Sequence, residues 1–166
     1  DFSYDDEVIC GNTRPDVEGV IGSSLNWKGF SVSLNFRYQM GADVFNEALY
    51  SKVENISRSD LNKNQDKRAL YERWQEEGDI VRFKNIASAE TTPMSSRFVQ
   101  EENVLTLESV YLGYEFYDGW IKKLGLSSLK FQVSMRDVFR ASTIRSERGI
   151  SYPFARSMEA GLSFNF

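Results

Sequence analysis

The chain has 166 residues, and its 24 Asp and Glu outnumber its 20 Lys and Arg, which gives a net charge of -4 and a pI near 5.0. This length suits one ordinary domain, and the charge offers no basic surface for a phosphate backbone, so we expect no nucleic-acid partner. The sequence has no histidine and one cysteine, Cys10, which excludes Ser-His-Asp catalysis, Cys-His catalysis and a cysteine zinc cluster. We therefore expect no enzyme activity, no cofactor and no metal.

The hydropathy of the sequence restricts the possible classes of protein further. Mean hydropathy is -0.44, and no run approaches the roughly 18 apolar residues of a membrane helix. The hydropathy does not exclude a transmembrane β-barrel, because the strands of a barrel alternate apolar and polar residues. The sequence begins at Asp1 without an initiator Met, so we expect a fragment or a mature segment of a larger protein.

Alternation of apolar and polar residues predicts two strands near the start. The first covers Val17 to Trp27, and Lys28-Gly29 has the length of a tight hairpin turn. The second covers 30–40, where every even-numbered residue is apolar and every odd-numbered one is polar. Its eleven residues match the about 9–11 of a transmembrane β-strand better than the about 5–6 of a soluble strand.

Residues 41–97 lack this alternation and are predicted to be a long loop. Within it, 64–77 is predicted to form a short helix, because Leu70, Tyr71 and Trp74 fall on one side at i, i+1 and i+4 and Gly78 follows at a helix end. Connections of this length are usually functional or form a small subdomain.

Three further strands are predicted after the loop. They cover 103–116, 129–139 and 157–166, with a phase slip near Glu108-Ser109 that indicates a bulge. Residues 140–155 are predicted to be a polar loop. In the last strand Met158, Ala160, Leu162, Phe164 and Phe166 alternate with polar or small residues, so this strand needs a partner strand and apolar surroundings.

A set of short motifs follows one order along nearly the whole chain. They are Gly11-Asn12-Thr13-Arg14-Pro15, Lys28-Gly29-Phe30, Arg73-Trp74, Gly78-Asp79, Ser95-Ser96-Arg97-Phe98-Val99, then Leu105, Leu107, Val110, Leu112, Gly113 and Tyr114, then Ser128-Leu129, Val133, Phe139, Tyr152-Pro153, Arg156-Ser157 and Phe166. In this order they resemble the C-terminal end of a SusC/RagA-type TonB-dependent outer-membrane transporter. Thr13, where the family often has Pro, and Asp137-Val138, where Asn-Leu is usual, depart from the pattern.

The resemblance implies an all-β fold, in which residues 1–166 form about the last five antiparallel strands of a large transmembrane barrel and 41–97 is a long extracellular loop. The plug domain, the TonB box and the earlier strands are not in this chain. The implied function is active import of a nutrient, an oligosaccharide or a peptide, across the bacterial outer membrane with energy from TonB. The implied partners are a SusD-like surface lipoprotein, the TonB complex, the barrel-assembly machinery and outer-membrane lipid.

Site residues follow from this interpretation. Short connections of such barrels are periplasmic and long ones extracellular, so Arg73, Trp74 and Arg97 lie in an extracellular region and are candidates for substrate binding. The remaining site residues are Ser33, Asn35 and Arg37, expected to face the lumen, and Leu162, Phe164 and Phe166, which the resemblance implies as the barrel-assembly signal.

Other interpretations of the same residues are also open. The alternation alone is equally typical of the inner face of a soluble β-sandwich, for example a carbohydrate-binding module, and a siderophore-type TonB-dependent receptor is a third class. Trp74 is expected more as the anchor of a loop helix than as a stacking site. Asp5, Asp6 and Glu7 are interpreted as a solvated acidic loop rather than a calcium site, and Cys10 has no assigned role.

Overall fold

The computed structural model describes residues 3–88, 90–117, 119–145 and 156–166. These residues divide into two compact units. We call the described part of 15–42, 102–143 and 156–166 the sheet body, and the described part of 3–14, 43–101 and 144–145 the loop body.

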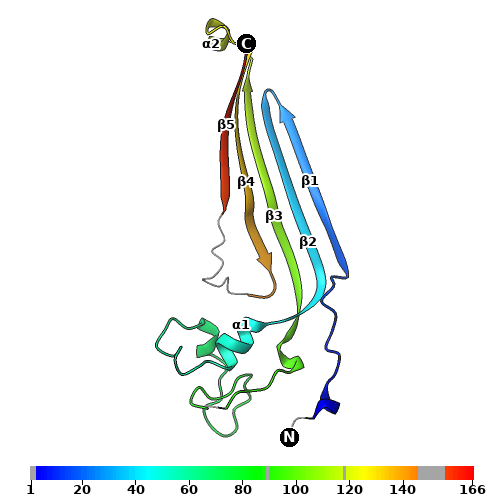
Figure 1. Cartoon of the computed structure of the whole chain (residues 1–166), viewed down its shortest axis with the longest axis vertical. Helices are drawn as coiled ribbons and strands as arrows, with labels where there is room; N and C mark the ends of the chain where they lie inside the picture. The colour runs from blue at the N-terminus through cyan, green and yellow to red at the C-terminus, as the bar shows by residue number, and fades with distance from the viewer. Residues whose placement is uncertain (1–2, 89, 118, 146–155) are drawn as a thin grey trace. The chain divides into compact units, whose positions relative to one another are not determined.

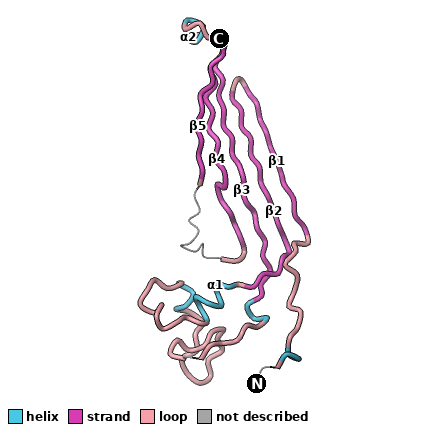
Figure 2. Tube along the Cα trace, in the orientation of Figure 1, coloured by secondary structure: helices cyan, strands magenta, loops and turns pink. Residues whose placement is uncertain are grey.

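One five-stranded antiparallel sheet forms the frame of the sheet body (Figure 1). Its strands are β1 (Val17–Trp27), β2 (Phe30–Phe45), β3 (Val99–Phe116), β4 (Ser128–Ser142) and β5 (Ser157–Asn165). Their order in the sheet is the order in the sequence, so each strand pairs with its neighbours along the chain. The strands are the long extended segments of Figure 2, and the sheet they make is open.

All five strands predicted from alternation are present, and the bounds of β1 are those predicted. β2 extends five residues beyond Met40, although Gly41 with φ 80° interrupts the side-chain pattern there. At this point the Gly41 amide donates to the side chain of Asn103, at Oδ1, over 2.9 Å. β3 likewise begins at Val99 rather than at 103.

A register shift lies where the phase slip predicted it, between Leu107 and Ser109 of β3. Leu107 pairs with Phe139 and Ser109 with Arg136, so the additional residue is on β4. Asp137, with φ 52°, is left-handed, as the first residue of a G1 bulge is, although that position is usually Gly. The predicted loop 140–155 starts later than expected, because β4 continues to Ser142; its residues 146–155, which include Tyr152-Pro153, lie outside the described residues.

The connections between paired strands differ in length. Lys28-Gly29 joins β1 to β2, and 117–127 joins β3 to β4 and contains the short helix α2 (Trp120–Lys123). Within the described part of the chain, no helix has both the length and the apolar character needed to cross a membrane.

The loop body is built from short helical turns and extended segments around a small core. Its helical elements are the 3₁₀ turn η1 (Tyr4–Asp6), α1 (Glu47–Leu49), the π-helical turn η2 (Tyr50–Glu54) and the 3₁₀ turns η3 (Lys67–Leu70) and η4 (Ser96–Phe98). The core consists of Leu49, Val53, Ala69, Phe83 and Phe98. The rings of Phe45, Tyr50 and Phe98 pack edge to face or tilted, with centroids 5.2 to 6.0 Å apart.

The helix predicted over 64–77 is not formed. Only Lys67–Leu70 make one 3₁₀ turn, which Asp66 caps by accepting from the Arg68 amide at 2.8 Å. The apolar side predicted for that helix faces no core, because Leu70, Tyr71 and Trp74 are exposed while Ala69 and Arg73 are buried. The chain leaves the turn in extended conformation, and Arg73 forms an isolated bridge with Phe83 instead of a helical hydrogen bond.

Candidate functional site

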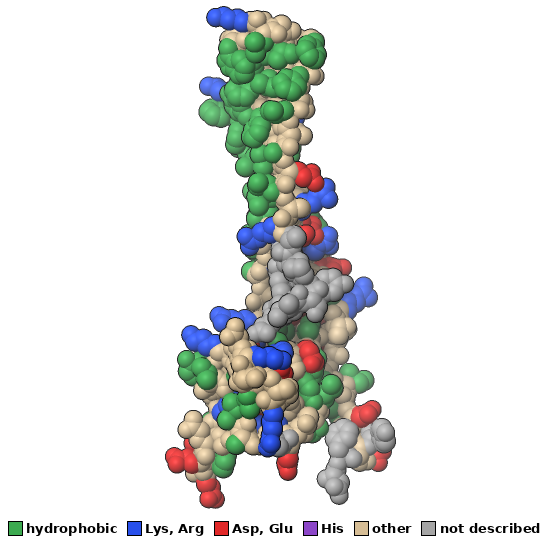
Figure 3. Space-filling model, turned by 60° about the vertical axis from the view of Figure 1, so that its left-hand side comes forward, with side chains coloured by type: hydrophobic (Ala, Val, Ile, Leu, Met, Phe, Trp, Pro, Cys, Tyr) green, Lys and Arg blue, Asp and Glu red, His purple; other side chains and the backbone are tan. Residues whose placement is uncertain are grey.

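The first candidate site is the apolar face of the sheet body. Residues that pair directly across antiparallel strands project on the same face, so the register defines rows of side chains. Four such rows run across β3, β4 and β5 and hold twelve apolar or aromatic residues: Val110, Met135 and Met158; Leu112, Val133 and Ala160; Tyr114, Phe131 and Leu162; Phe116, Leu129 and Phe164. Figure 3 shows hydrophobic side chains gathered along one side of the sheet.

β1 and β2 add to this face, because Asn35 of β2 contacts Ser109 of β3 on the opposite, polar face. Trp27 pairs with Phe30, Leu25 with Val32 and Ile21 with Phe36, so the even-numbered residues of 30–40 share one face as predicted. Many side chains of the apolar face are uncovered. On β3, β4 and β5, between 40% and 68% of the surface is exposed at Leu112, Tyr114, Phe131, Met158, Leu162 and Phe164. An apolar face this continuous marks an interaction with another apolar phase or partner.

The opposite face is polar. Ser33, Asn35 and Arg37 pair with Ser24, Gly22 and Val20, one residue out of phase with the apolar pairs. Asn35 Nδ2 donates to Ser109 Oγ at 2.9 Å, and Arg37 forms an ion pair with Glu108. These cross-strand contacts bind β2 to β3 on the face that the sequence assigned to the lumen.

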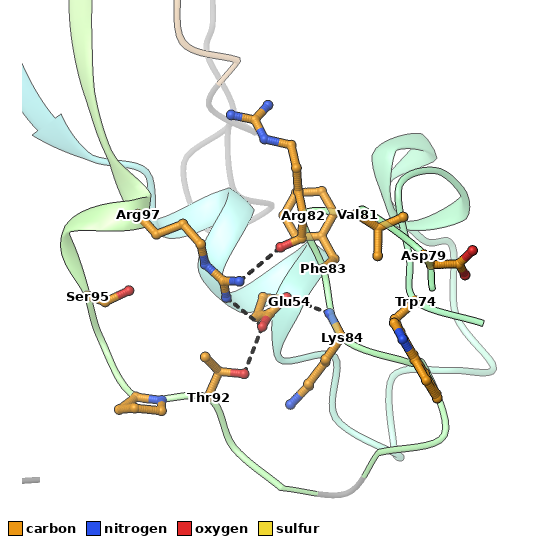
Figure 4. A pocket seen from close by; sticks show the side chains of 11 residues that line it. Glu54, Trp74, Asp79, Val81, Arg82, Phe83, Lys84, Thr92, Ser95 and Arg97 are labelled. Carbon is orange, nitrogen blue, oxygen red and sulfur yellow. Dashed lines mark hydrogen bonds and ion pairs between the residues drawn. The ribbon is translucent and has the colours of Figure 1, made fainter. Parts of the chain in front are cut away.

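The second candidate site is an open pocket of about 490 Å³ in the loop body (Figure 4). Its lining includes Trp74, Asp79, Val81, Pro93 and Arg97, and the buried carboxylate of Glu54. Trp74, half exposed, contributes an aromatic surface to this pocket. Trp74 is therefore placed at a solvent-facing site and does not anchor a helix.

Glu54 organises this pocket. Its carboxylate accepts from Thr92 Oγ1 at 2.8 Å, from Arg97 Nη2 at 2.7 Å and from the Lys84 amide at 3.3 Å. Burial alone raises the pKa of Glu54, but the hydrogen bonds from Thr92, Arg97 and Lys84 and the charge of Arg97 outweigh it, so the pKa lies below its ordinary value. The carboxylate is thus kept ionised and holds the three segments that bear its partners together.

Arg97 has a fixed side chain that is still accessible. Nη1 donates to the Arg82 carbonyl at 2.9 Å while Nη2 holds Glu54, and the guanidinium lies 4.7 Å from the centroid of the Phe98 ring. About 46% of the side chain faces solvent. A ligand in the pocket meets a cation of defined orientation here.

Arg73 occupies a different environment from its neighbour Trp74. It is buried, and its guanidinium donates to the carbonyls of Ala69 at 2.6 Å, Lys84 at 2.9 Å and Val53. Burial lowers the pKa of Arg73, and the charge of Glu54 counteracts this effect. The Arg73 donors are thereby committed to backbone carbonyls of the loop body rather than pointed into the pocket.

Sequence reasoning missed Glu54, Asn55 and Thr92. The Asn55 side chain bonds the Thr92 backbone on both sides, accepting from its amide at 2.9 Å and donating to its carbonyl at 3.1 Å. These residues lie in a polar stretch without periodicity, so no local pattern distinguishes them from solvated side chains. Asn55 also lines a second, larger pocket of about 840 Å³ with Ile56, Arg58, Leu61 and Ile86.

Cys10 and the acidic N-terminal residues have simple surroundings. Cys10 is exposed, with its Sγ 3.3 Å from the Val8 carbonyl oxygen. Asp5, Asp6 and Glu7 are exposed, and the described residues contain no group of three or more acidic or thiol side chains placed to hold a metal ion.

The described residues thus form an open sheet with one apolar and one polar face, and a loop body with its own core. The chain superposes over its whole length on 19% of a chain in the structure of the RagAB peptide importer in the closed-closed state, with a TM-score of 0.71 and 19% identity. This likeness concerns the fold.

Two curated relatives are both named as TonB-dependent receptors. TonB-dependent receptor P39 of Formosa agariphila is 25% identical over 146 residues, which cover 84% of this chain and 14% of that protein. TonB-dependent receptor P3 of the same organism is 22% identical over all of this chain and 18% of its own length. No family model matches the chain.

Together these findings confirm the resemblance predicted from the ordered motifs. The chain resembles a segment of the SusC/RagA-type TonB-dependent receptors. It spans less than a fifth of the length of each relative.

Proposed function

We propose that this chain forms the C-terminal part of the transmembrane barrel of a TonB-dependent importer in the bacterial outer membrane. The sheet body is part of the barrel wall, and the loop body, which contains most of 41–97, lies on the extracellular side. The observation that carries the proposal is the uncovered apolar face that runs through paired rows of β1–β2 and of β3–β5.

Strand length supports the same assignment. β1 to β4 have 11, 16, 18 and 15 residues, and β5 has 9, so each reaches the about 9–11 residues that cross a bilayer. A soluble sandwich, the main alternative, packs a second sheet on the apolar face. The described residues form one sheet, and the uncovered side chains of its apolar face do not favour that alternative.

The cargo is a nutrient, an oligosaccharide or a peptide, and a SusD-like lipoprotein covers the extracellular side. The name of the RagAB peptide importer supports a peptide as one cargo class. The half-exposed Trp74 and the oriented Arg97 form the cargo-contacting surface of the pocket, and the buried Arg73 supports it through the carbonyl of the lining residue Lys84. Replacement of Trp74 by Ala is expected to weaken cargo binding by the full-length importer, while Leu70→Ala, also at an exposed position, leaves it unchanged. Equal binding by both variants would remove this assignment.

The last strand, β5, is needed both for assembly into the membrane and for closure of the barrel. An open strand edge in lipid leaves backbone groups unpaired, so β5 must pair with a further strand of the full-length protein. Leu162, Phe164 and Phe166 provide the apolar signal, ending in an aromatic residue, for the barrel-assembly machinery, and the TonB complex acts through parts outside this chain. A Phe166→Ser variant is expected in the outer membrane at a reduced amount, and normal amounts would count against the signal.

Cysteine labelling tests the central proposal. In the full-length protein with Cys10→Ser, a cysteine at Leu34 is expected to react with a lipid-soluble maleimide, whereas one at Ser33 reacts with a water-soluble maleimide. The two positions are adjacent on β2 and differ only in the face they occupy. Failure of the lipid-soluble reagent at Leu34 would overturn the membrane assignment.

A further inference from the structure

The larger pocket of the loop body, of about 840 Å³, has no part in the proposed function so far. The described residues that line it include Ile56, Leu61 and Ile86 and no aromatic side chain. Ile56 packs against the core of the loop body, whereas about half of the surface of Leu61 and of Ile86 is exposed. This second pocket therefore offers an aliphatic surface that is anchored to the core and accessible from solvent.

Hydrogen bonds fix the chain segments that surround the second pocket. The side-chain oxygen of Asn55 accepts from the Thr92 amide and from Lys84 Nζ, each at 2.9 Å. The segments 57–60 and 85–88 are turns, each closed by a backbone hydrogen bond of 3.0 Å. The walls of the second pocket are thus formed before a ligand arrives, as is usual for a binding site.

The charges of the second pocket leave one cation for a ligand. Its lining contains the cations Arg58 and Lys84 and one acid, Glu90, and Lys84 Nζ also donates to the Glu90 carbonyl. Asp60, in the same turn as Arg58, is paired with Lys63 at 2.7 Å. Arg58 is exposed and has no hydrogen-bond or ion-pair partner among the described residues. The lining therefore has a net positive charge, with Arg58 as its unpaired group.

The two pockets of the loop body adjoin at Lys84, which lines both of them and is labelled in Figure 4. Its backbone amide donates to Glu54 in the first pocket, and its side chain donates to Asn55 in the second. An extended ligand that contacts Trp74 in the first pocket can therefore place its end in the second.

We propose that the second pocket binds the C-terminal residue of a peptide, with an aliphatic side chain against Ile56, Leu61 and Ile86 and with the terminal carboxylate at Arg58. The inference rests on the proposed function and deepens it, because it names the end and the side chain of a peptide cargo that the loop body recognises. Apolar walls with a few polar groups that orient the ligand are typical of such pockets. Arginine pairs with a carboxylate through two parallel N–H donors.

The lining favours this ligand over other cargo. It has no ring on which a sugar could stack, and its aliphatic walls would leave sugar hydroxyls without partners, at a cost in free energy. The hydroxyls of Ser88 and Thr91, which also line the pocket, suit the amide and carbonyl groups of a peptide backbone. The volume lies within the about 300–1,000 Å³ of ligand pockets, so the residue before the last also fits.

Binding of labelled peptides to the full-length protein in detergent micelles tests the second pocket. The probe is Gly-Ser-Gly-Ala-Leu with a fluorophore on its N-terminus and a free carboxylate, and fluorescence anisotropy measures its dissociation constant. One matched probe ends in leucine amide, and another ends in serine with a free carboxylate. The leucine carboxylate probe is expected to bind about fivefold tighter than either, because each of the others lacks the ion pair or the aliphatic contact.

Matched variants assign the two contacts. Arg58→Gln is expected to bind the leucine carboxylate and leucine amide probes equally, while its affinity for the amide stays at the wild-type value, which shows that the pocket is intact. Arg14→Gln makes the same charge change at another exposed position of the loop body and is expected to keep the preference. Leu61→Ser is expected to lose the preference for leucine over serine and to keep that for carboxylate over amide.

The outcomes separate this inference from the proposed function. Equal binding of the carboxylate and amide probes by the wild type, or an unchanged preference in Arg58→Gln, would overturn the C-terminal site and leave the proposed function intact. Isocaproate has the same aliphatic carboxylate without a peptide backbone, and competition as strong as that of the unlabelled peptide would overturn the peptide as its ligand. Failure of all three probes to bind would overturn the inference and remove peptides from the proposed cargo, whereas labelling at Leu34 and Ser33 tests the barrel independently.

Discussion

The sheet body and the loop body differ in the side chains that they bury and expose. The sheet body pairs its backbone between strands and leaves large apolar side chains such as Phe131 and Leu162 uncovered. The loop body buries a few apolar side chains and also the charged groups of Glu54 and Arg73, each with hydrogen-bond partners. The first arrangement suits an apolar solvent, and the second suits water.

The largest effect should come from the core of the loop body. Phe98 is fully buried between Phe45 and Tyr50, so Phe98→Ala is expected to cost the loop body about 3–5 kcal/mol. Hydrogen exchange of amides in 46–56 in the full-length protein measures this loss. Phe164→Ala removes a ring of equal size from the uncovered face and should leave exchange in 46–56 unchanged. Equal exchange in the wild type and Phe98→Ala would show that the core does not hold the loop body.

A charge on the apolar face should have the next largest effect. Leu34→Arg is expected to lower the free energy of unfolding in lipid vesicles by about 2–4 kcal/mol if position 34 lies near the midplane. Ser33→Arg, one residue away on the polar face, is expected to cost far less. Denaturant titration of both full-length variants makes the comparison, and equal costs would show that lipid does not cover one face alone.

A substitution of Arg73 tests whether this residue supports the fold of the loop body or contacts the cargo. Arg73→Met fills similar space but leaves the carbonyls of Val53, Ala69 and Lys84 without their donor, at a cost of about 1–3 kcal/mol to the loop body. Exchange of amides near these carbonyls should rise. Cargo affinity, corrected for the folded fraction, should change less than it does in Trp74→Ala, and the reverse order would make Arg73 a contact residue.

Acid should loosen the loop body through Glu54. Because the folded pKa of Glu54 is below its unfolded value, its contribution is present above the unfolded pKa, near 4.3, and is lost as pH falls through the folded pKa. Glu54→Gln cannot titrate and is expected to lose about 1 kcal/mol at neutral pH. Asp66 and Asp79 also have lowered pKa values, so the informative quantity is the difference between wild type and variant in exchange of 46–56. A difference that does not shrink with acid would contradict this role.

The sequence allowed the sheet body to be predicted in some detail and the loop body hardly at all. Side chains alternate along a strand because of its pleat, so the phases of 17–27, 30–40 and 157–166 and the irregularity beside Glu108 are local signals. The loop body depends on contacts between distant residues, such as Glu54 with Thr92 and Arg97. The apolar spacing of Leu70, Tyr71 and Trp74 predicted a helix, although no core lies beneath that side.

The central claim is that lipid covers one face of the sheet and water the other. Spin labels placed singly at 129–136 of β4, in the full-length protein with Cys10→Ser in vesicles, report access of oxygen and of a water-soluble nickel complex. The account predicts alternation with a period of two residues, with oxygen favoured at Leu129, Phe131, Val133 and Met135 and nickel at the positions between them. Access that is alike at both sets of positions, or protection of the first set from both reagents, would contradict it.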